Sequence, residues 1–301
     1  MPSNRFQESF VMPPPSQNSP NQPPNQPPNS PRNSTGAKHF SAVRCIGGAL
    51  RYMMESRRDL LILATPPVIG LSIIGTLVHI AVPNLGMTPE GTPIGGPATL
   101  WAILGLFALN VAFYIMFAVA WHRRFLLPDE VVTVSQALSW RPEKSRFLLF
   151  LILIALLVFM TIMALGAFMP IIMMAAGQGP GVAGIGVMVT LVAVAMLFAR
   201  LALVLPAAAI GLKDFKMRDS WMATKGHSIS MFLVVLLPTL IAVVASLPVL
   251  MVAQLFGDVA QTWTGSTIAA LIAQALNYFA IALGVSSLSI AFTDLVGTGR
   301  R

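Results

Sequence analysis

Six long apolar stretches constrain this chain more than any other feature of its sequence. A helix rises about 1.5 Å per residue, so about 20 apolar residues are needed to cross a hydrocarbon layer about 30 Å thick. Six stretches meet this requirement: residues 60–82, 100–120, 147–169, 182–205, 229–256 and 268–296. The sequence therefore predicts an all-α fold, a polytopic membrane helix bundle with six transmembrane helices. The last two stretches exceed what a perpendicular crossing needs, which predicts tilt or a bend.

The distribution of charge predicts the orientation of the bundle. Only 10% of the residues are charged, and the formal net charge is +8. The loops at 83–99, 176–181 and 257–265 contain no Lys or Arg, whereas the alternate connections and the C-terminus do. Because basic residues in short loops stay cytoplasmic, both termini are predicted to lie on the cytoplasmic side of a bacterial inner membrane. No surface combines basic and aromatic residues, so we expect no nucleic-acid partner.

The first 37 residues differ in composition from the remainder. They contain a Met12-Pro-Pro-Pro run and two Asn-Gln-Pro-Pro copies, with few large apolar residues and no apolar stretch of the signal-peptide type. Dense proline removes amide donors and favours extended polyproline II. We therefore predict a disordered cytoplasmic tail at 1–37 and a six-helix transmembrane domain at 38–301. Docking of the tail on a partner stays open beside a plain solvated tail.

A short amphipathic segment precedes the first span. Apolar residues recur at three- and four-residue steps from Phe40 to Met54, while Arg44, Arg51 and Arg58 recur every seven residues on another face. This pattern predicts a helix that lies in the membrane interface. Its basic face would meet anionic head groups.

Two similar motifs precede later spans. Ser139-Trp140-x-x-x-Lys144 stands before the third span, and Ser220-Trp221-x-x-x-Lys225 stands before the fifth. They indicate three repeated units, each an interfacial helix followed by a hairpin. Ordinary anchoring by Trp and Lys at an interface would produce the same motifs, so both interpretations stay open.

The strongest local pattern is Arg200-Leu-Ala-Leu-Val-Leu-Pro206-Ala-Ala-Ala, followed by Asp219-Ser-Trp221-Met-Ala-Thr-Lys-Gly226-His227. On these residues the chain resembles a group of bacterial six-helix membrane proteins. That group is similar to the membrane domain that precedes the catalytic barrel of some glycerophosphodiester phosphodiesterases. The architectural likeness covers about residues 40–296. The barrel is missing from this sequence, so the resemblance implies the membrane fold without the catalytic activity.

Arg200 is the basic residue that lies inside a predicted span. Burying a charge in the membrane is costly, so such a residue marks a candidate functional site. In the interpretation we prefer, the helix leaves the membrane near Pro206 and the guanidinium snorkels to the surface. In the alternative, Arg200 is buried and pairs with Asp294 near the cytoplasmic end of the last span.

A second group of candidate contacts surrounds Gly226. A glycine turn with Lys225 suits an anion, but it lacks the upstream strand and the GxxxxGK[ST] spacing of a nucleotide loop. We therefore expect contact with a lipid head group, or plain anchoring. The candidate ligand or lipid contacts are Arg200, Trp221, Lys225, His227 and Asp294.

The sequence predicts no catalytic, cofactor-binding or metal site. Cys45 is the one cysteine, and His79 and His122 lack a second His, Glu or Cys three or four residues away. Asn277 and the serines and small residues of the last span indicate helix–helix contact, with a substrate path as the alternative.

These observations favour a non-catalytic function. An enzyme needs convergent acids, bases, nucleophiles or metals, and the predicted spans carry almost none. We prefer an integral inner-membrane protein that organises lipids, including anionic head groups, or partner membrane proteins. The alternative is a small-molecule or ion transporter or channel, with Arg200 lining a cavity.

Overall fold

The computed structural model describes residues 40–81, 86–87, 93–94, 97–130, 132–176, 180–255 and 263–297. The chain divides into two units, Met1–His39 and Phe40–Arg301, and every described residue belongs to the second. The predicted tail at 1–37 lies outside the described residues, so its conformation stays a prediction.

Six helices are long and apolar enough to cross a membrane, which confirms the predicted all-α class. They are α2 (Arg57–Ala81), α3 (Pro97–Leu126), α5 (Pro142–Ala176), α6 (Pro180–Leu201), α9 (Ser228–Leu255) and α11 (Trp263–Leu295). By the length and composition of these helices, the chain is a multi-pass membrane protein.

Each long helix begins before the apolar stretch that predicted it. Pro97, Pro142 and Pro180 are the first residues of α3, α5 and α6, whose apolar stretches start at 100, 147 and 182. The first turn of a helix does not use its amide N–H groups, and the fixed φ of proline suits it. Proline therefore sets the helix starts that hydropathy places too late.

Short elements separate the long helices. The short helix α1 (Ala42–Glu55) precedes α2, α4 (Val134–Leu138) precedes α5, and α7 (Val204–Ala209) and α8 (Met217–Ala223) precede α9. Two-residue strands, β1 (Gly86–Met87) and β2 (Pro93–Ile94), pair antiparallel between α2 and α3. Within the described residues, one or two short helices precede a pair of long helices three times, in the order of the three predicted units.

The fourth predicted span, residues 182–205, is divided near its end. The helix α6 stops at Leu201, residues 202–203 form a turn, and α7 continues to Ala209. Pro206 lies in the first turn of α7, where its missing N–H breaks no intrahelical bond. Every residue from Leu201 to Ala209 is buried, so the chain passes here through the interior of the bundle.

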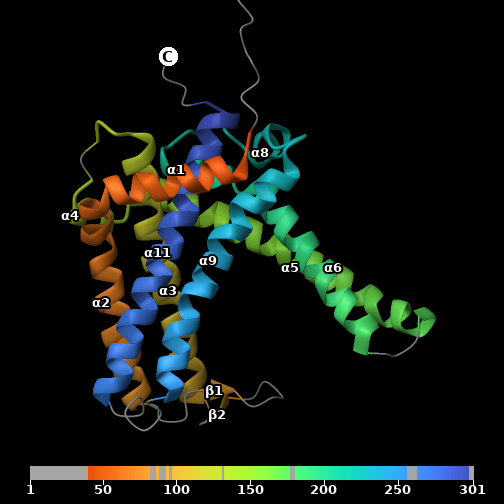
Figure 1. The fold of residues 1–301 in the computed structure, drawn as a ribbon, viewed down its shortest axis with the longest axis horizontal. Coiled ribbons are helices and arrows are strands. Elements are labelled where there is room, and N and C mark those ends of the chain that lie inside the picture. The colour runs from red at the N-terminus through yellow and green to blue at the C-terminus, as the bar shows by residue number, and fades with distance from the viewer. Residues whose placement is uncertain are drawn as a thin grey trace, which may run out of the picture. The chain divides into compact units, whose positions relative to one another are not determined.

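Buried residues concentrate where α3, α6 and α11 end. These regions include residues 117–122, 199, 201–209 and 285–289. The helix α11 contacts α1, α2, α3, α7 and α9. The helices α5 and α6 run side by side; α6 also packs against α9, and the ends of α5 and α6 far from this region lean away from α9 and α11 (Figure 1). Exposed apolar side chains such as Phe159 and Phe168 cover this pair, as expected of a surface that meets hydrocarbon.

Candidate functional site

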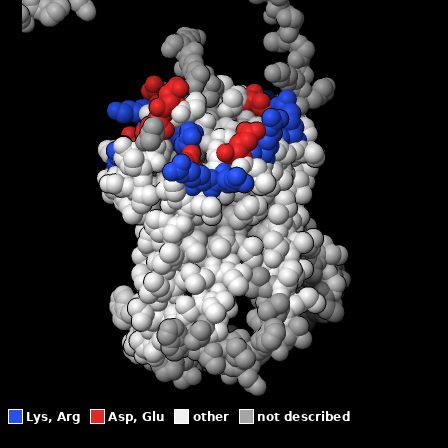
Figure 2. All heavy atoms as spheres, turned by 60° about the vertical axis from the view of Figure 1, so that its left-hand side comes forward, with Lys and Arg blue, Asp and Glu red and all other residues white. Residues whose placement is uncertain are grey.

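The charged residues gather at one end of the bundle, which we call the charged end (Figure 2). The described part of the chain contains fourteen Lys and Arg and eight Asp and Glu. They stand on α1 and α8, on the connections around α4 and α8, and at the ends of α2, α3, α5, α6 and α11 that meet there. Among the described residues, the remaining length of each long helix carries no charge.

The helix α1 crosses the charged end (Figure 1). It has one apolar face buried against the bundle and another exposed. Cys45, Ala49 and Met53 are buried against the bundle. Val43 and Met54 belong to the stripe that the sequence pattern identified, and their side chains are 74% and 71% exposed. The part of the stripe that lies on α1 therefore points away from the bundle, whereas Phe40, which precedes the helix, is buried; a different face holds α1 to the protein.

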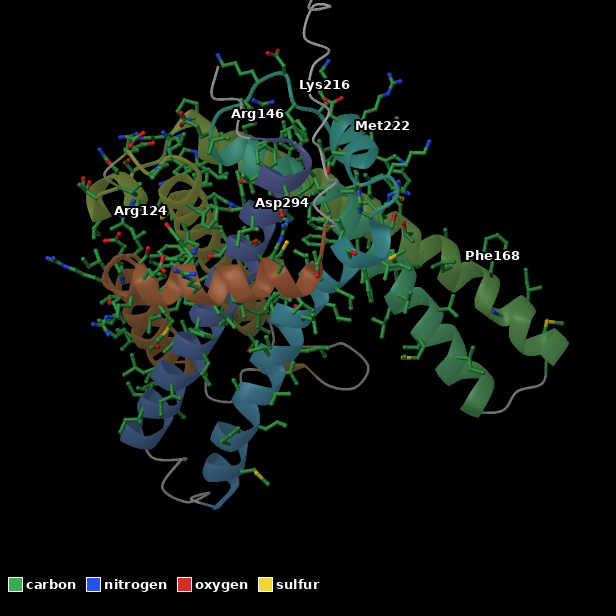
Figure 3. All side chains as sticks on the ribbon, turned by 45° about the horizontal axis from the view of Figure 1, so that its top comes forward. Arg124, Arg146, Phe168, Lys216, Met222 and Asp294 are labelled. Carbon is green, nitrogen blue, oxygen red and sulfur yellow. The ribbon has the colours of Figure 1, made fainter. Side chains whose placement is uncertain are left out.

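An ion pair joins α1 to the end of α11. Arg44 Nη2 lies 2.5 Å from Asp294 Oδ2, and Figure 3 shows Asp294 at this end of α11. Asp294 therefore does not pair with Arg200, which was the alternative prediction for these residues. Asp294 pairs with Arg44 because α1 packs across α11 in the folded chain and so supplies a closer arginine.

A second group of ion pairs joins the end of α3 to its neighbours. Arg123 donates to both carboxylate oxygens of Glu130, at 2.9 and 2.7 Å, and to the Ala209 carbonyl oxygen of α7 at 3.2 Å. The adjacent Arg124 donates to Asp59 of α2 at 2.7 Å. These contacts connect α2, α3 and α7 at the charged end.

Arg200 lies at the end of α6, against α8. Its Cζ is 3.7 Å from the centroid of the Trp221 ring, and its Nη2 donates to the Trp221 carbonyl oxygen at 3.4 Å. The Arg200 carbonyl oxygen accepts a hydrogen bond of 2.8 Å from Ser220 Oγ. Its Nε is buried and has no hydrogen-bond partner among the described residues. The guanidinium therefore ends at the charged end, stacked on α8.

Lys225 and His227 flank a turn between α8 and α9. Gly226 between them has a φ of 85°, a left-handed conformation that glycine adopts readily. The His227 ring meets the Phe40 ring edge-on, with centroids 5.5 Å apart. The Lys225 side chain is exposed. Of these two candidate contacts, Lys225 is the more exposed, and His227 is half-buried.

The two Ser-Trp-x-x-x-Lys motifs have different structural roles. Lys144 is 2% exposed, and its Nζ donates to the carbonyl oxygens of Gln136, Ala137 and Ser139 at the end of α4. The last carbonyl groups of a helix lack intrahelical donors and carry partial negative charge, so an ammonium group satisfies them. The equivalent Lys225 is exposed.

Buried hydrogen bonds connect α3 and α11 beneath the charged end. Trp121 Nε1 donates to Ser286 Oγ at 2.7 Å, and His122 Nδ1 lies 2.8 Å from Ser289 Oγ. These serines lie between the two helices, as their predicted role in helix–helix contact requires. The sequence could not pair them with Trp121 and His122, because the partners are 165 and 167 residues apart.

A cavity of about 300 Å³ lies between α3, α6, α7, α9 and α11. Its polar lining residues are Tyr114, His122, Thr239 and Asn277, and the other lining residues are apolar. Arg200 does not line it, and neither does any other charged residue of the described chain. This cavity is therefore not the Arg200-lined cavity of the transport alternative, which stays a prediction. In the described part of the chain, no three His, Cys, Asp or Glu side chains gather as metal ligands.

Comparison of the chain with models of protein families, with curated proteins and with solved structures found no match. The likeness to the membrane domain of glycerophosphodiester phosphodiesterases stays a prediction. It depends on residues 200–209 and 219–227, which the structure places side by side, because Ser220 and Trp221 both bond to Arg200.

Proposed function

We propose that this multi-pass protein is a non-catalytic component of a bacterial inner membrane, with both termini in the cytoplasm. Its charged end binds the head groups of anionic phospholipids and so organises lipids and partner membrane proteins around it. The observation that carries this proposal is the outward face of α1.

The outward face of α1 combines apolar and basic side chains. Val43 and Met54 are exposed apolar residues, and Arg44 and Arg51 stand beside them on the helix surface. An interfacial helix places its apolar side chains at the boundary of the acyl chains and its basic side chains among phosphate groups. This face therefore suits a membrane surface, and the bundle beneath holds it in place through Cys45 and its buried neighbours.

Basic side chains without an ion-pair partner also stand elsewhere at the charged end. Within the described residues, the exposed members of this set are Arg57, Arg58, Arg141, Lys213, Lys216, Arg218 and Lys225. Each Lys or Arg near an anionic membrane surface contributes about 1 kcal/mol of attraction. Asp214 and Asp219 are exposed acidic residues outside these ion pairs, but the seven basic groups outnumber them, so the unpaired charge at this end is mainly positive, which suits anionic lipids. We call these seven residues the basic set.

The proposal is tested by the lipids that the protein retains. Purified protein is reconstituted into nanodiscs that contain phosphatidylcholine and phosphatidylglycerol, then released into mild detergent, and the bound lipids are identified by native mass spectrometry. We expect several-fold enrichment of phosphatidylglycerol, which falls in high salt because salt screens exposed charges.

Two variants decide whether the basic set is responsible. The first replaces all seven residues with Gln, and the matched control exchanges Arg for Lys and Lys for Arg at the same positions, which keeps the charge. We expect the Gln variant to lose the enrichment and the exchanged variant to retain it. Equal enrichment in the wild type and the Gln variant would contradict the proposal.

A further inference from the structure

The chemistry of the cavity between α3, α6, α7, α9 and α11 restricts what it can hold. Ten of its fourteen lining residues are apolar or glycine, and none is charged. A charged ligand would lie unpaired there, at a high desolvation cost, and a mostly apolar cavity does not hold water well. Its volume of about 300 Å³ is at the lower end of the range for small-molecule sites. The occupant that fits is neutral and largely apolar.

His122 supplies an open hydrogen-bond acceptor in this lining. The Ser289 hydroxyl donates its one proton to the Val285 carbonyl oxygen at 2.9 Å, so it accepts from His122 Nδ1 at 2.8 Å. A neutral imidazole that donates through Nδ1 presents a lone pair at Nε2. The His122 side chain is 1% exposed, and no described residue forms a hydrogen bond with Nε2. The matching group on a ligand is a donor, such as a hydroxyl.

The cavity opens at mid-height of the long helices. Thr239 and Asn277 line it and are exposed, whereas His122 at its inner end is buried. Thr239 follows the start of α9 at Ser228 by eleven residues, which is about 16 Å along the helix axis. In a membrane this level lies in the hydrocarbon layer. Entry from the bilayer is therefore more direct than entry from water.

We infer that this cavity binds a neutral, hydroxyl-bearing apolar molecule taken up from the bilayer, and that its hydroxyl donates to His122 Nε2. A long-chain alcohol is the simplest member of this chemical class. The site is separate from the basic set that binds anionic head groups, because no charged residue lines it. The failure of one of the two proposals would therefore leave the other unaffected.

The test uses a hexadecanol that carries a photoreactive diazirine on its chain. The protein is reconstituted in phosphatidylcholine nanodiscs and irradiated with this probe, and the labelled residues are mapped by mass spectrometry. We expect labels on α9 and α11 at the cavity lining. Hexadecan-1-ol should compete with the probe roughly tenfold better than hexadecane, because one net hydrogen bond changes an affinity by about that factor. Butan-1-ol at the same aqueous concentration should not compete, since a bilayer source requires a long chain.

Two leucine substitutions separate this cavity from the lipid-facing surface. A Cβ atom at Gly284 would meet only Pro238 Cβ, at 3.9 Å, so Gly284→Leu is tolerated by the backbone and extends into the cavity region. Gly166 on α5 has nothing within 4 Å of such an atom, and Gly166→Leu is the matched control. We expect Gly284→Leu to reduce cavity labelling at least fivefold and the control to leave it unchanged. Labelling that survives Gly284→Leu would overturn the proposal.

His122→Phe tests the hydrogen bond itself. In this variant hexadecan-1-ol and hexadecane should compete equally, since the acceptor is gone. The Gly284→Leu comparison decides the proposal even where His122→Phe fails to fold. Equal competition by the alcohol and the alkane in the wild type would overturn the role of His122, and competition by butan-1-ol would overturn the bilayer source.

Discussion

At the scale of single residues, Arg200 shows how a tertiary contact can accommodate a charged residue that the sequence places inside a membrane span. Its guanidinium stacks on the Trp221 ring at 3.7 Å, so α8 provides a partner for the cation at the end of the helix. A cation over an indole ring is worth about 0.5–2 kcal/mol, depending on its exposure to water. The residue is thus held by a neighbouring short helix and not by an acid in the membrane.

We expect Arg200 and Trp221 to contribute to stability together. Arg200→Ala should destabilise the protein by about 1–2 kcal/mol, because the stacking is lost and the Trp221 carbonyl oxygen loses a donor. Arg200→Lys should cost less, since a cation remains over the ring. A double-mutant cycle with Trp221→Ala, read by thermal unfolding in one detergent, should give a coupling of about 1 kcal/mol. Additive effects would show that the two residues act separately.

Cys45 should be inert in the folded protein. Burial raises the pKa of its thiol to about 11, an effect that Asp294 increases and Arg44 opposes. The thiolate is the reactive form, so we expect no alkylation by N-ethylmaleimide at pH 8 until the protein is denatured. The control is Val43→Cys in a Cys45→Ala background, on the exposed face of the same helix, which should react within minutes.

The same shift in pKa has a consequence for stability. The unfolded thiol ionises near its ordinary pKa of 9.0, whereas the folded thiol keeps its proton up to about pH 11. The protonated thiol therefore contributes to the free energy of unfolding in full below pH 9.0, and this contribution is lost as the pH rises towards 11. Cys45→Ala should lose less stability than the wild type over that interval, as measured by thermal unfolding.

At the scale of elements, the short helices of the charged end depend on polar side chains that satisfy the hydrogen-bonding groups at their ends. The helix α4 begins with a capping box, in which Thr133 Oγ1 accepts from the Gln136 N–H and Gln136 Oε1 accepts from the Thr133 N–H, both at 3.3 Å. It ends on the ammonium group of Lys144. Both ends of this five-residue helix are thus satisfied by side chains, which stabilises a helix too short to form alone.

The two motif lysines should respond differently to the same substitution. Lys144→Gln removes the donor from three carbonyl oxygens that end α4, and we expect a loss of about 1–3 kcal/mol. Lys225→Gln is the matched control at the equivalent exposed position, where the change should stay within about 0.5 kcal/mol. Thermal unfolding of both variants beside the wild type measures the difference. Equal losses would contradict the separate roles assigned to the two motifs.

At the scale of the whole molecule, the separation of charge predicts a single orientation. The described Lys and Arg gather at one end, and the connections at the other end contain none in the sequence. Reporter fusions after Thr92, Gly179 and Gly265 should therefore read periplasmic. Fusions after Glu143 and Asp219 should read cytoplasmic, because basic loops are retained on that side. An inverted result at any of the five positions would contradict the six-span topology.

The long helices were predictable from the sequence, whereas their starts and the division of the fourth were not. Hydropathy located each span, because a helix in hydrocarbon must be apolar over about 20 residues. It could not reveal that Pro142 belongs to α5, or that the chain turns after Leu201. Those boundaries depend on backbone hydrogen bonding and on the packing of α7, to which an average over apolar residues is insensitive.

The candidate site was predictable only in part. The sequence by itself determined the helical class, the six spans and the charge asymmetry, because the hydrophobic effect and the cost of burying charge act on composition along the chain. The tertiary structure alone decided the partners. It pairs Asp294 with Arg44, stacks Arg200 on Trp221, encloses Lys144 and leaves His122 with an open acceptor beside a cavity. These contacts join residues far apart in sequence, and their geometry arises only when the helices pack.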